Sequence, residues 1–241
     1  MKEYFDKLYI KTAKEFHAEM KDNLVNNKKA FVVTANPETL MIAESNDEFK
    51  KALLDKDTTI VPDGIGVVKG ARMLGIKVKE RIPGVEFSEK LLEYANELGK
   101  SVYLFGSKKE VIEKMEQIIK EKYSNIKIVG MQDGYIEDKD KVFDDIVEKE
   151  PDIILVALGI PKQELIIYKN LNRFKKGIFV GVGGTFDVLS GLKKRAPKFF
   201  LKFHLEWLYR ICKEPNRFKR FYESNIKYIS IIRKEKRGMK K

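Results

Sequence analysis

The sequence predicts an α/β fold: a mostly parallel sheet of about six strands flanked by helices, with a small helical C-terminal appendage. Short apolar runs alternate with longer segments of helical periodicity, the order expected of strands joined by crossover helices. The run 153–158 has no polar alternation, which is typical of a strand covered on both faces. Glycine, proline or asparagine follows most of these runs and marks the turns.

Apolar spacing and terminal residue types predict the helices. Phe16, Met20 and Leu24 recur every four residues and predict an amphipathic helix near the start of the chain. Asn36 and Pro37 are residue types of a helix cap and a first helical turn, so the next helix is expected to begin there.

The expected strands are 30–33, 58–61, 102–105, 126–129, 153–158 and 178–182. The expected helices are 12–26, a segment from 37 that restarts near 47 and reaches 54, then 65–74, 87–98, 110–122, 141–149 and one that starts within 159–164. No regular element is expected over 1–10, which is charged and irregular. The chain is divided into an α/β domain, 1–195, and a basic, aromatic, helical appendage, 196–241.

The appendage carries the charge of the chain. Residues 192–241 hold 17 Lys and Arg but only 4 Asp and Glu, so they supply the whole net charge of +12. Aromatic residues are interleaved with these cations, and Pro215 separates two expected helices. Such a segment predicts an anionic partner, whether membrane phosphate, a diphosphate ligand or nucleic acid.

Composition restricts the class of protein. The single cysteine, Cys212, leaves no internal disulfide and fits a reducing compartment. No signal peptide is expected over 1–14, and no apolar run approaches the roughly 20 residues of a spanning helix. His17 and His204 have no second His or Cys nearby, so no metal site and no cofactor are expected. The expected location is cytoplasmic, peripheral on the inner face of the membrane.

Polar residues gather where the expected strands end, the edge at which open parallel sheets bind ligands. Asp63 follows an apolar strand in Pro-Asp-Gly, and is either a turn residue or a carboxylate able to deprotonate a hydroxyl. Thr34 and Asn36 are either capping residues or ligands for sugar hydroxyls. Arg81 is either a solvated charge or a guanidinium placed beside the Pro83-Gly84 turn.

The glycine-rich stretch 181–187 (Gly-Val-Gly-Gly-Thr-Phe-Asp) follows the last expected strand. It lacks the third glycine of a dinucleotide fingerprint and comes late in the chain. It is either a tight strand-to-helix turn or a loop whose N–H groups approach a diphosphate at a helix N-terminus. In the second case Asp187 would contact a ribose or base.

Seven motifs in order carry a family resemblance: Thr34-x-Asn36, Pro62-Asp63-Gly64, Arg81-x-Pro83-Gly84, Gly159-x-Pro161-Lys162-Gln163-Glu164, the 181–187 stretch, Arg195-Ala196-Pro197 and Leu205-Glu206-Trp207-Leu208-Tyr209-Arg210. Together they resemble the WecG/TagA/CpsF family of glycosyltransferases over residues 30–222. Each motif is weak alone, and the combination is specific.

The resemblance implies an inverting, metal-independent hexosyltransferase that uses a UDP-sugar donor and a polyprenyl-diphosphate-linked sugar acceptor. The best-known members add N-acetylmannosamine to undecaprenyl-diphosphate-N-acetylglucosamine in teichoic acid synthesis. Others transfer glucose or N-acetylmannosaminuronic acid into related surface polysaccharides.

The resemblance also implies roles for individual residues. Asp63 is the implied base. The implied pocket residues are Thr34, Asn36, Arg81 and Gln163, and those beside UDP are Gly183, Gly184, Phe186 and Asp187. The appendage residues implied to close over the site at the membrane and meet diphosphate charge are Arg210, Arg217 and Arg220.

Two functions from other classes remain open on the residues alone. The basic appendage would also suit a nucleic-acid-binding protein, although no nucleic-acid motif accompanies it, and no nucleic-acid partner is expected. The glycine-rich stretch would also suit an NAD-dependent enzyme, against which its incomplete glycine pattern argues. A detached aromatic appendage would leave apolar surface exposed, which is consistent with a homodimer or homotrimer.

Overall fold

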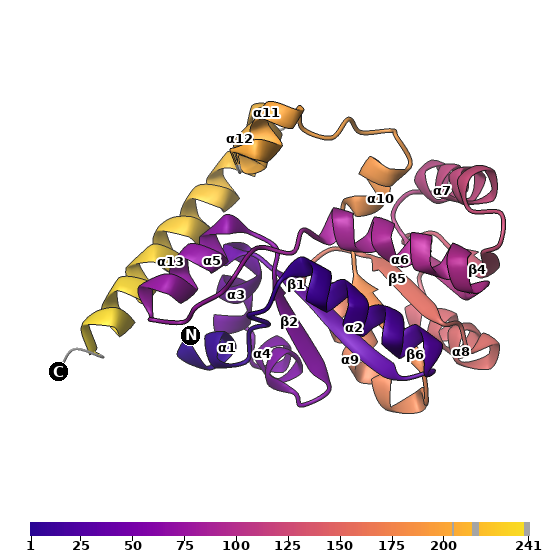
Figure 1. Cartoon of the computed structure of the whole chain (residues 1–241), viewed down its shortest axis with the longest axis horizontal. Coiled ribbons are helices and arrows are strands. Elements are labelled where there is room, and N and C mark those ends of the chain that lie inside the picture. Colours follow the sequence, from indigo (N-terminus) through magenta and orange to yellow (C-terminus); the bar gives the residue numbers. More distant parts are fainter. Residues whose placement is uncertain (204, 214–216, 239–241) are drawn as a thin grey trace.

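The computed structural model describes residues 1–203, 205–213 and 217–238 of the chain, without the side chains of Arg210, Arg217 and Arg220 (Figure 1). Its centre is a six-stranded parallel sheet in the order β2-β1-β6-β5-β3-β4. The strands are β1 (Lys29–Ala35), β2 (Thr58–Pro62), β3 (Ser101–Gly106), β4 (Lys127–Gln132), β5 (Ile153–Ala157) and β6 (Gly177–Gly181). The α/β class and the strand count predicted from the sequence are confirmed.

Helices cover both faces of this sheet. The helices of the described residues are α1 (Lys2–Asp6), α2 (Ala13–Val25), α3 (Pro37–Glu44), α4 (Asp47–Leu54), α5 (Ile65–Met73), α6 (Gly84–Leu98), α7 (Lys109–Lys122), α8 (Lys139–Lys149), α9 (Lys162–Asn170), α10 (Thr185–Leu189), α11 (Lys198–Lys202), α12 (Glu206–Lys213) and α13 (Arg217–Gly238), with a 3₁₀ turn at Leu171–Arg173. Every predicted helix is present. The start of α2 shows why: Thr12 and Glu15 form a reciprocal capping box.

Two hydrophobic cores lie on opposite faces of the sheet. Phe31 and Val33 of β1 point into the core formed with α1, α3, α4, α5, α8 and α9, whereas Val32 points into the core formed with α2, α6 and α7. Successive side chains of a strand point to opposite faces. Because both faces are covered, the strands are apolar without alternation, and this explains the pattern of the 153–158 run.

The prediction of no regular element over residues 1–10 is wrong. Residues Lys2–Asp6 form α1, and Tyr4 and Phe5 of this helix are buried in the first core. Leu8 then forms an isolated parallel bridge with Ile60 of β2. A helix of five residues has little stability of its own and forms only because it packs against the body, so local sequence signals do not predict it.

The C-terminal helix packs on the body rather than standing apart. In Figure 1, α13 runs alongside α3 and α5, while α11 and α12 lie at its N-terminal end, joined to α10 by an extended segment. Tyr228 and Ile232 of α13 are 3% and 1% exposed and belong to the first core. The Tyr228 hydroxyl donates to the Gly66 carbonyl of α5 at 3.1 Å. The division into domains at residue 195 stays a prediction.

Candidate functional site

Four neighbouring strands bring most of the predicted site residues to one edge of the sheet. Thr34 and Asn36 lie at the end of β1, Asp63 follows β2, Gln163 follows β5 and Gly183 follows β6. These strands are adjacent in the order β2-β1-β6-β5, with β1 and β2 in register from Phe31↔Thr58 to Ala35↔Pro62. At about 4.8 Å between strands, the four carboxyl ends span only about 14 Å.

Asp63 is held at the N-terminus of a long helix. Its N–H donates to the Ala35 carbonyl at 3.0 Å, which extends the pairing of β1 and β2 by one residue. Its Oδ1 accepts a hydrogen bond from the Gly84 N–H, at the start of α6, at 2.8 Å. The N-terminal end of a helix stabilises negative charge. The carboxylate is half-buried, and the hydrogen bond from Gly84 fixes its orientation at the end of β2.

The segment that carries Arg81 crosses the same strand end. The Ile82 N–H donates to the Pro62 carbonyl, the last residue of β2, at 2.7 Å. The backbone at Arg81, which is half-buried, therefore passes close to the Asp63 turn. The structure thus brings the backbone of two segments about 18 positions apart to one strand end, and contact of Arg81 with a substrate stays a prediction.

Thr34 and Asn36 lie beneath the start of α6 and at the start of α3. Asn36 caps α3: its Oδ1 accepts from the Thr39 N–H at 3.1 Å, and Thr39 Oγ1 accepts from the Asn36 N–H at 3.2 Å. A Cβ on Gly84 would lie 3.3 Å from Thr34 Oγ1. The absence of a side chain at Gly84 thus lets the α6 N-terminus approach Thr34. Capping by Asn36 is confirmed, and its contact with a sugar stays a prediction.

The glycine-rich loop after β6 turns on Gly183. This residue has a φ of +48°, a left-handed conformation that glycine adopts at least cost. Its N–H donates to Gln163 Oε1 at 3.0 Å. The Phe186 side chain is 0% exposed and packs in the second core, where it supports the loop from below. Asp187 forms an ion pair with Lys193 at 3.7 Å, and Gly184 is exposed.

Gln163 and Glu164 form a buried pair under this loop. Each is 2% exposed, and Gln163 Nε2 donates to Glu164 Oε1 at 2.7 Å. Gln163 Oε1 accepts from the N–H of Gly183 and from the N–H of Gly159 at 3.1 Å. The carboxamide thus joins the loops after β5 and β6. Contact of Gln163 with a substrate, like that of Phe186, stays a prediction.

Sequence reasoning missed Glu164 as a functional candidate. An acidic residue in the first turn of a helix is usually a solvated partner of the helix dipole, and nothing in the sequence distinguishes Glu164 from that case. Here burial raises the pKa of its carboxyl to about 7, while the hydrogen bond from Gln163 acts in the opposite direction. Its Oε2 has no hydrogen-bond partner among the residues described.

The sequence profile of the glycosyl transferase WecG/TagA/CpsF family matches residues 5–241. The chain belongs to this family. The match spans both the sheet edge around Asp63 and the C-terminal helices, so the two parts are common features of one family of glycosyltransferases.

Similar members of the family share one name. A protein of Bacillus spizizenii is 41% identical over 218 residues, 90% of this chain and 84% of that protein. Proteins of Bacillus subtilis (39% identical; 88% of this chain, 82% of that protein) and Staphylococcus aureus (35%; 96% and 89%) are comparably similar. All three are named N-acetylglucosaminyldiphosphoundecaprenol N-acetyl-beta-D-mannosaminyltransferase.

The three arginines predicted for the glycosyltransferase site lie in the C-terminal helices. Arg210 is in α12, and Arg217 and Arg220 are at the start of α13, but their side chains lie outside the described part of the structure. The helices around them expose large apolar side chains: Phe199, Phe203, Trp207, Leu208, Phe218, Tyr222, Ile226 and Ile229. In the ranges that the structure describes, no helix is long and apolar enough to cross a bilayer.

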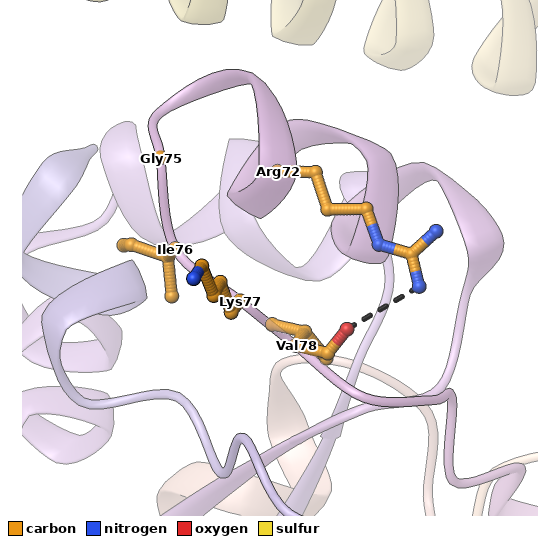
Figure 2. Close-up of a pocket in the computed structure, with 5 residues that line it drawn as sticks. All are labelled: Arg72, Gly75, Ile76, Lys77 and Val78. Carbon is orange, nitrogen blue, oxygen red and sulfur yellow. Dashed lines mark hydrogen bonds between the residues drawn. The ribbon is translucent and has the colours of Figure 1, made fainter.

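A hollow of about 360 Å³ lies away from these residues, at the C-terminal end of α5. Figure 2 shows it lined by Arg72, Gly75, Ile76, Lys77 and Val78. The Arg72 guanidinium donates to the carbonyls of Val78 and Lys79, both at 3.3 Å, and so closes the turn after α5. None of the site residues predicted from the sequence lines this hollow. Over the described residues, no three His, Cys, Asp or Glu side chains are grouped to hold a metal ion.

Proposed function

We propose that this glycosyltransferase moves N-acetylmannosamine from UDP-N-acetylmannosamine to undecaprenyl-diphosphate-linked N-acetylglucosamine, in the synthesis of teichoic acid or a related surface polysaccharide. The relatives at 35–41% identity carry the name of this hexosyltransferase and support the sugar and the acceptor. The observation that carries the chemistry is the Asp63 carboxylate, oriented by the Gly84 N–H at the ligand-binding edge of the sheet.

The proposed reaction is a single displacement. Asp63 takes the proton of the acceptor hydroxyl, whose oxygen forms a bond to the anomeric carbon. The bond from that carbon to the β-phosphate oxygen breaks, and UDP departs with the electron pair. Attack from the face opposite UDP inverts the anomeric configuration. In this scheme Asp63 is the sole acceptor of the hydroxyl proton, so a rate enhancement of about 10²–10⁴-fold from general-base catalysis depends on it.

The leaving diphosphate is proposed to meet cationic and N–H groups of the protein rather than a metal ion. Arg81 lies at the Asp63 turn, and the backbone of Arg217 and Arg220 begins the helix that packs on α5. Charge-assisted bonds between guanidinium and phosphate groups are strong where water is excluded. Gly184, Asp187 and the other residues of the loop after β6 are proposed to contact the nucleotide.

The acceptor is proposed to be reached at an anionic membrane surface, on the inner face. Support comes from the exposed aromatic side chains of α11, α12 and the first half of α13, in the segment that carries the positive charge of the chain. Helices with aromatic and basic side chains bind in the interfacial region of a bilayer. A homo-oligomer built on the same apolar surface is a further proposal, which light scattering of the purified protein checks.

A UDP-release assay tests the proposed function. The purified chain is supplied with a short-chain lipid-diphosphate N-acetylglucosamine acceptor and a panel of UDP-sugars, with chelator present. Turnover is expected with UDP-N-acetylmannosamine, and NMR of the product is expected to show inversion. If UDP-glucose or the uronic acid form were the preferred substrate, it would take the place of UDP-N-acetylmannosamine as the proposed donor. If no UDP were released from any donor, the proposal would be overturned.

A further inference from the structure

The buried pair Gln163–Glu164 has no role in the proposed reaction. A carboxamide has one acceptor atom and one donor group, and here two backbone N–H donors, from Gly159 and Gly183, use the single acceptor Oε1. If the carboxamide were rotated by 180°, its NH₂ group would face both N–H donors. Two buried N–H groups would then lose their acceptor, at a cost of about 1–3 kcal/mol each.

Glu164 favours the same orientation of the carboxamide from its NH₂ side. Its Oε1 accepts a hydrogen bond from Gln163 Nε2 at 2.7 Å, as a carboxyl oxygen does both when the group is ionised and when the proton is on Oε2. The acceptor therefore keeps the NH₂ group of Gln163 on the α9 side. The oxygen of Gln163 is left facing the two loops.

The end of β6 is shaped to admit this pair. A Cβ at Gly181 would lie 2.6 Å from Gln163 Nε2 and 2.7 Å from Glu164 Oε1, closer than van der Waals contact allows. Glycine at this position thus leaves the space that both polar side chains occupy. Gly181 also begins the stretch that leads to Gly183, so the pair and the loop share one strand end.

We propose that Glu164 is a positioning residue of the enzyme: by orienting the Gln163 carboxamide, it holds the loop from Gly181 to Gly184 in the form that receives the nucleotide of the donor. That the ligand of this loop is a nucleotide rests on the proposed function. That Glu164 holds the loop through Gln163 rests only on the hydrogen bonds described. Glu164 itself touches neither loop through a described hydrogen bond, so its effect passes through Gln163.

Two substitutions at Glu164 separate orientation from packing. Glu164→Gln keeps an acceptor oxygen for Gln163 Nε2. Glu164→Leu fills a similar volume without an acceptor, and is expected to stay folded, because the loss of a partner for Gln163 Nε2 is offset by removal of a buried carboxyl group whose Oε2 has no described partner. Glu148→Gln, at an exposed position on α8, is the matched control. Each is combined with Gln163→Leu in a double-mutant cycle.

The first readout needs no substrate. Hydrogen exchange of the Gly183 N–H is measured in the full-length chain. In Glu164→Leu it is expected to quicken by about tenfold or more, in Glu164→Gln to stay within about twofold of the parent. Unchanged exchange of Gly183 in a folded Glu164→Leu variant would overturn the inference, whether or not the protein is a UDP-dependent enzyme.

The second readout is affinity for UDP, measured by calorimetry, with the KM for the UDP-sugar beside it. Glu164→Leu is expected to raise the Kd for UDP about tenfold, with less change in kcat and with unfolding still above the assay temperature. Adding Glu164→Leu to Gln163→Leu is expected to weaken UDP binding no further. Additive losses would show that Glu164 acts by another route, and failure of the parent chain to bind UDP would instead count against the proposed function.

Discussion

At the scale of single residues, the structure places Asp63 where backbone groups define its position from two sides. The Ala35 carbonyl receives its N–H, and the Gly84 N–H donates to its carboxylate. These two hydrogen bonds use the backbone N–H and Oδ1 of Asp63, and neither of them involves Oδ2. A substitution that keeps the shape of the side chain can therefore separate its chemistry from its structural role.

Asp63→Asn is expected to lower kcat by about 10²–10⁴-fold, because an amide cannot accept the hydroxyl proton. Its Oδ1 still accepts from Gly84, so the unfolding temperature is expected to stay close to that of the parent. Asp22→Asn, at an exposed residue of α2, is the control. Turnover of Asp63→Asn within threefold of the parent would exclude Asp63 as the base.

Glu164 is expected to give the stability of the protein a pH dependence. Its pKa is 4.5 in the unfolded chain and about 7 in the folded protein. Between these values the folded state holds a proton that the unfolded state has lost, so the free energy of unfolding falls as pH rises from about 4.5 to 7 and levels off above. This rise of the pKa to about 7 corresponds to about 3 kcal/mol.

Urea unfolding from pH 4.5 to 8 measures this effect. The Glu164→Gln variant lacks the titrating group, so it is expected to gain about 3 kcal/mol relative to the parent by pH 7. The exposed Glu148→Gln control is expected to follow the parent. Parallel curves for Glu164→Gln and the parent would show that the carboxyl stays ionised in the fold.

At the scale of elements, helix α13 is fixed to α5 by one aromatic residue. Tyr228 lies over Gly70, where a Cβ would collide with its hydroxyl and lie 3.3 Å from Phe5 Cζ. The same hydroxyl donates to Gly66. Helix α5, which follows the Asp63 turn, therefore holds α13 together with α3, and this connects Asp63 to the helix bearing Arg217 and Arg220.

Gly70→Ala is expected to destabilise the protein by about 1–3 kcal/mol, although alanine is the better helix former, because Tyr228 must move. Tyr228→Phe is expected to cost about 1 kcal/mol through the lost hydrogen bond. In the double variant the penalty of Gly70→Ala is expected to shrink. Equal penalties in both backgrounds, measured by urea unfolding, would mean that Tyr228 does not contact Gly70.

At the scale of the whole molecule, the positive charge and most of the exposed aromatic residues occur in the same C-terminal segment. Deleting everything after Pro197 is expected to abolish transfer and vesicle binding. It also removes Tyr228 and Ile232 from the first core, so the truncated body is expected to lose stability too. Surface substitutions therefore test the membrane proposal more cleanly than a deletion does.

The double substitution Phe199→Ser and Phe203→Ser is expected to weaken binding to phosphatidylglycerol vesicles by at least tenfold, since the two rings are 62% and 55% exposed. Co-sedimentation measures it. Val25→Ser with Tyr135→Ser, at exposed residues outside the C-terminal helices, is the control and is expected to bind as the parent does. Equal binding by both double variants would remove these aromatic residues from the membrane contact.

The sequence by itself determined the α/β class, the strands, the long helices and the edge of the sheet at which the candidate site residues gather. Apolar periodicity and caps such as Asn36 are local signals, and residues that follow parallel strands must meet at one edge. Helix α1, within the first ten residues, was not predicted from the sequence, because it is stable only through the packing of Tyr4 and Phe5.

Only the tertiary structure decided how the site is supported. That Gly84 donates to Asp63, that Gln163 joins the loops of Gly159 and Gly183, and that Tyr228 fixes α13 over Gly70 are contacts between residues far apart in the chain. Burial raises the pKa of Glu164, and burial depends on the packed fold, not on the residues adjacent in the sequence. A glutamate in a first helical turn looks solvated in the sequence, and becomes a buried acid only when β6 packs beside it.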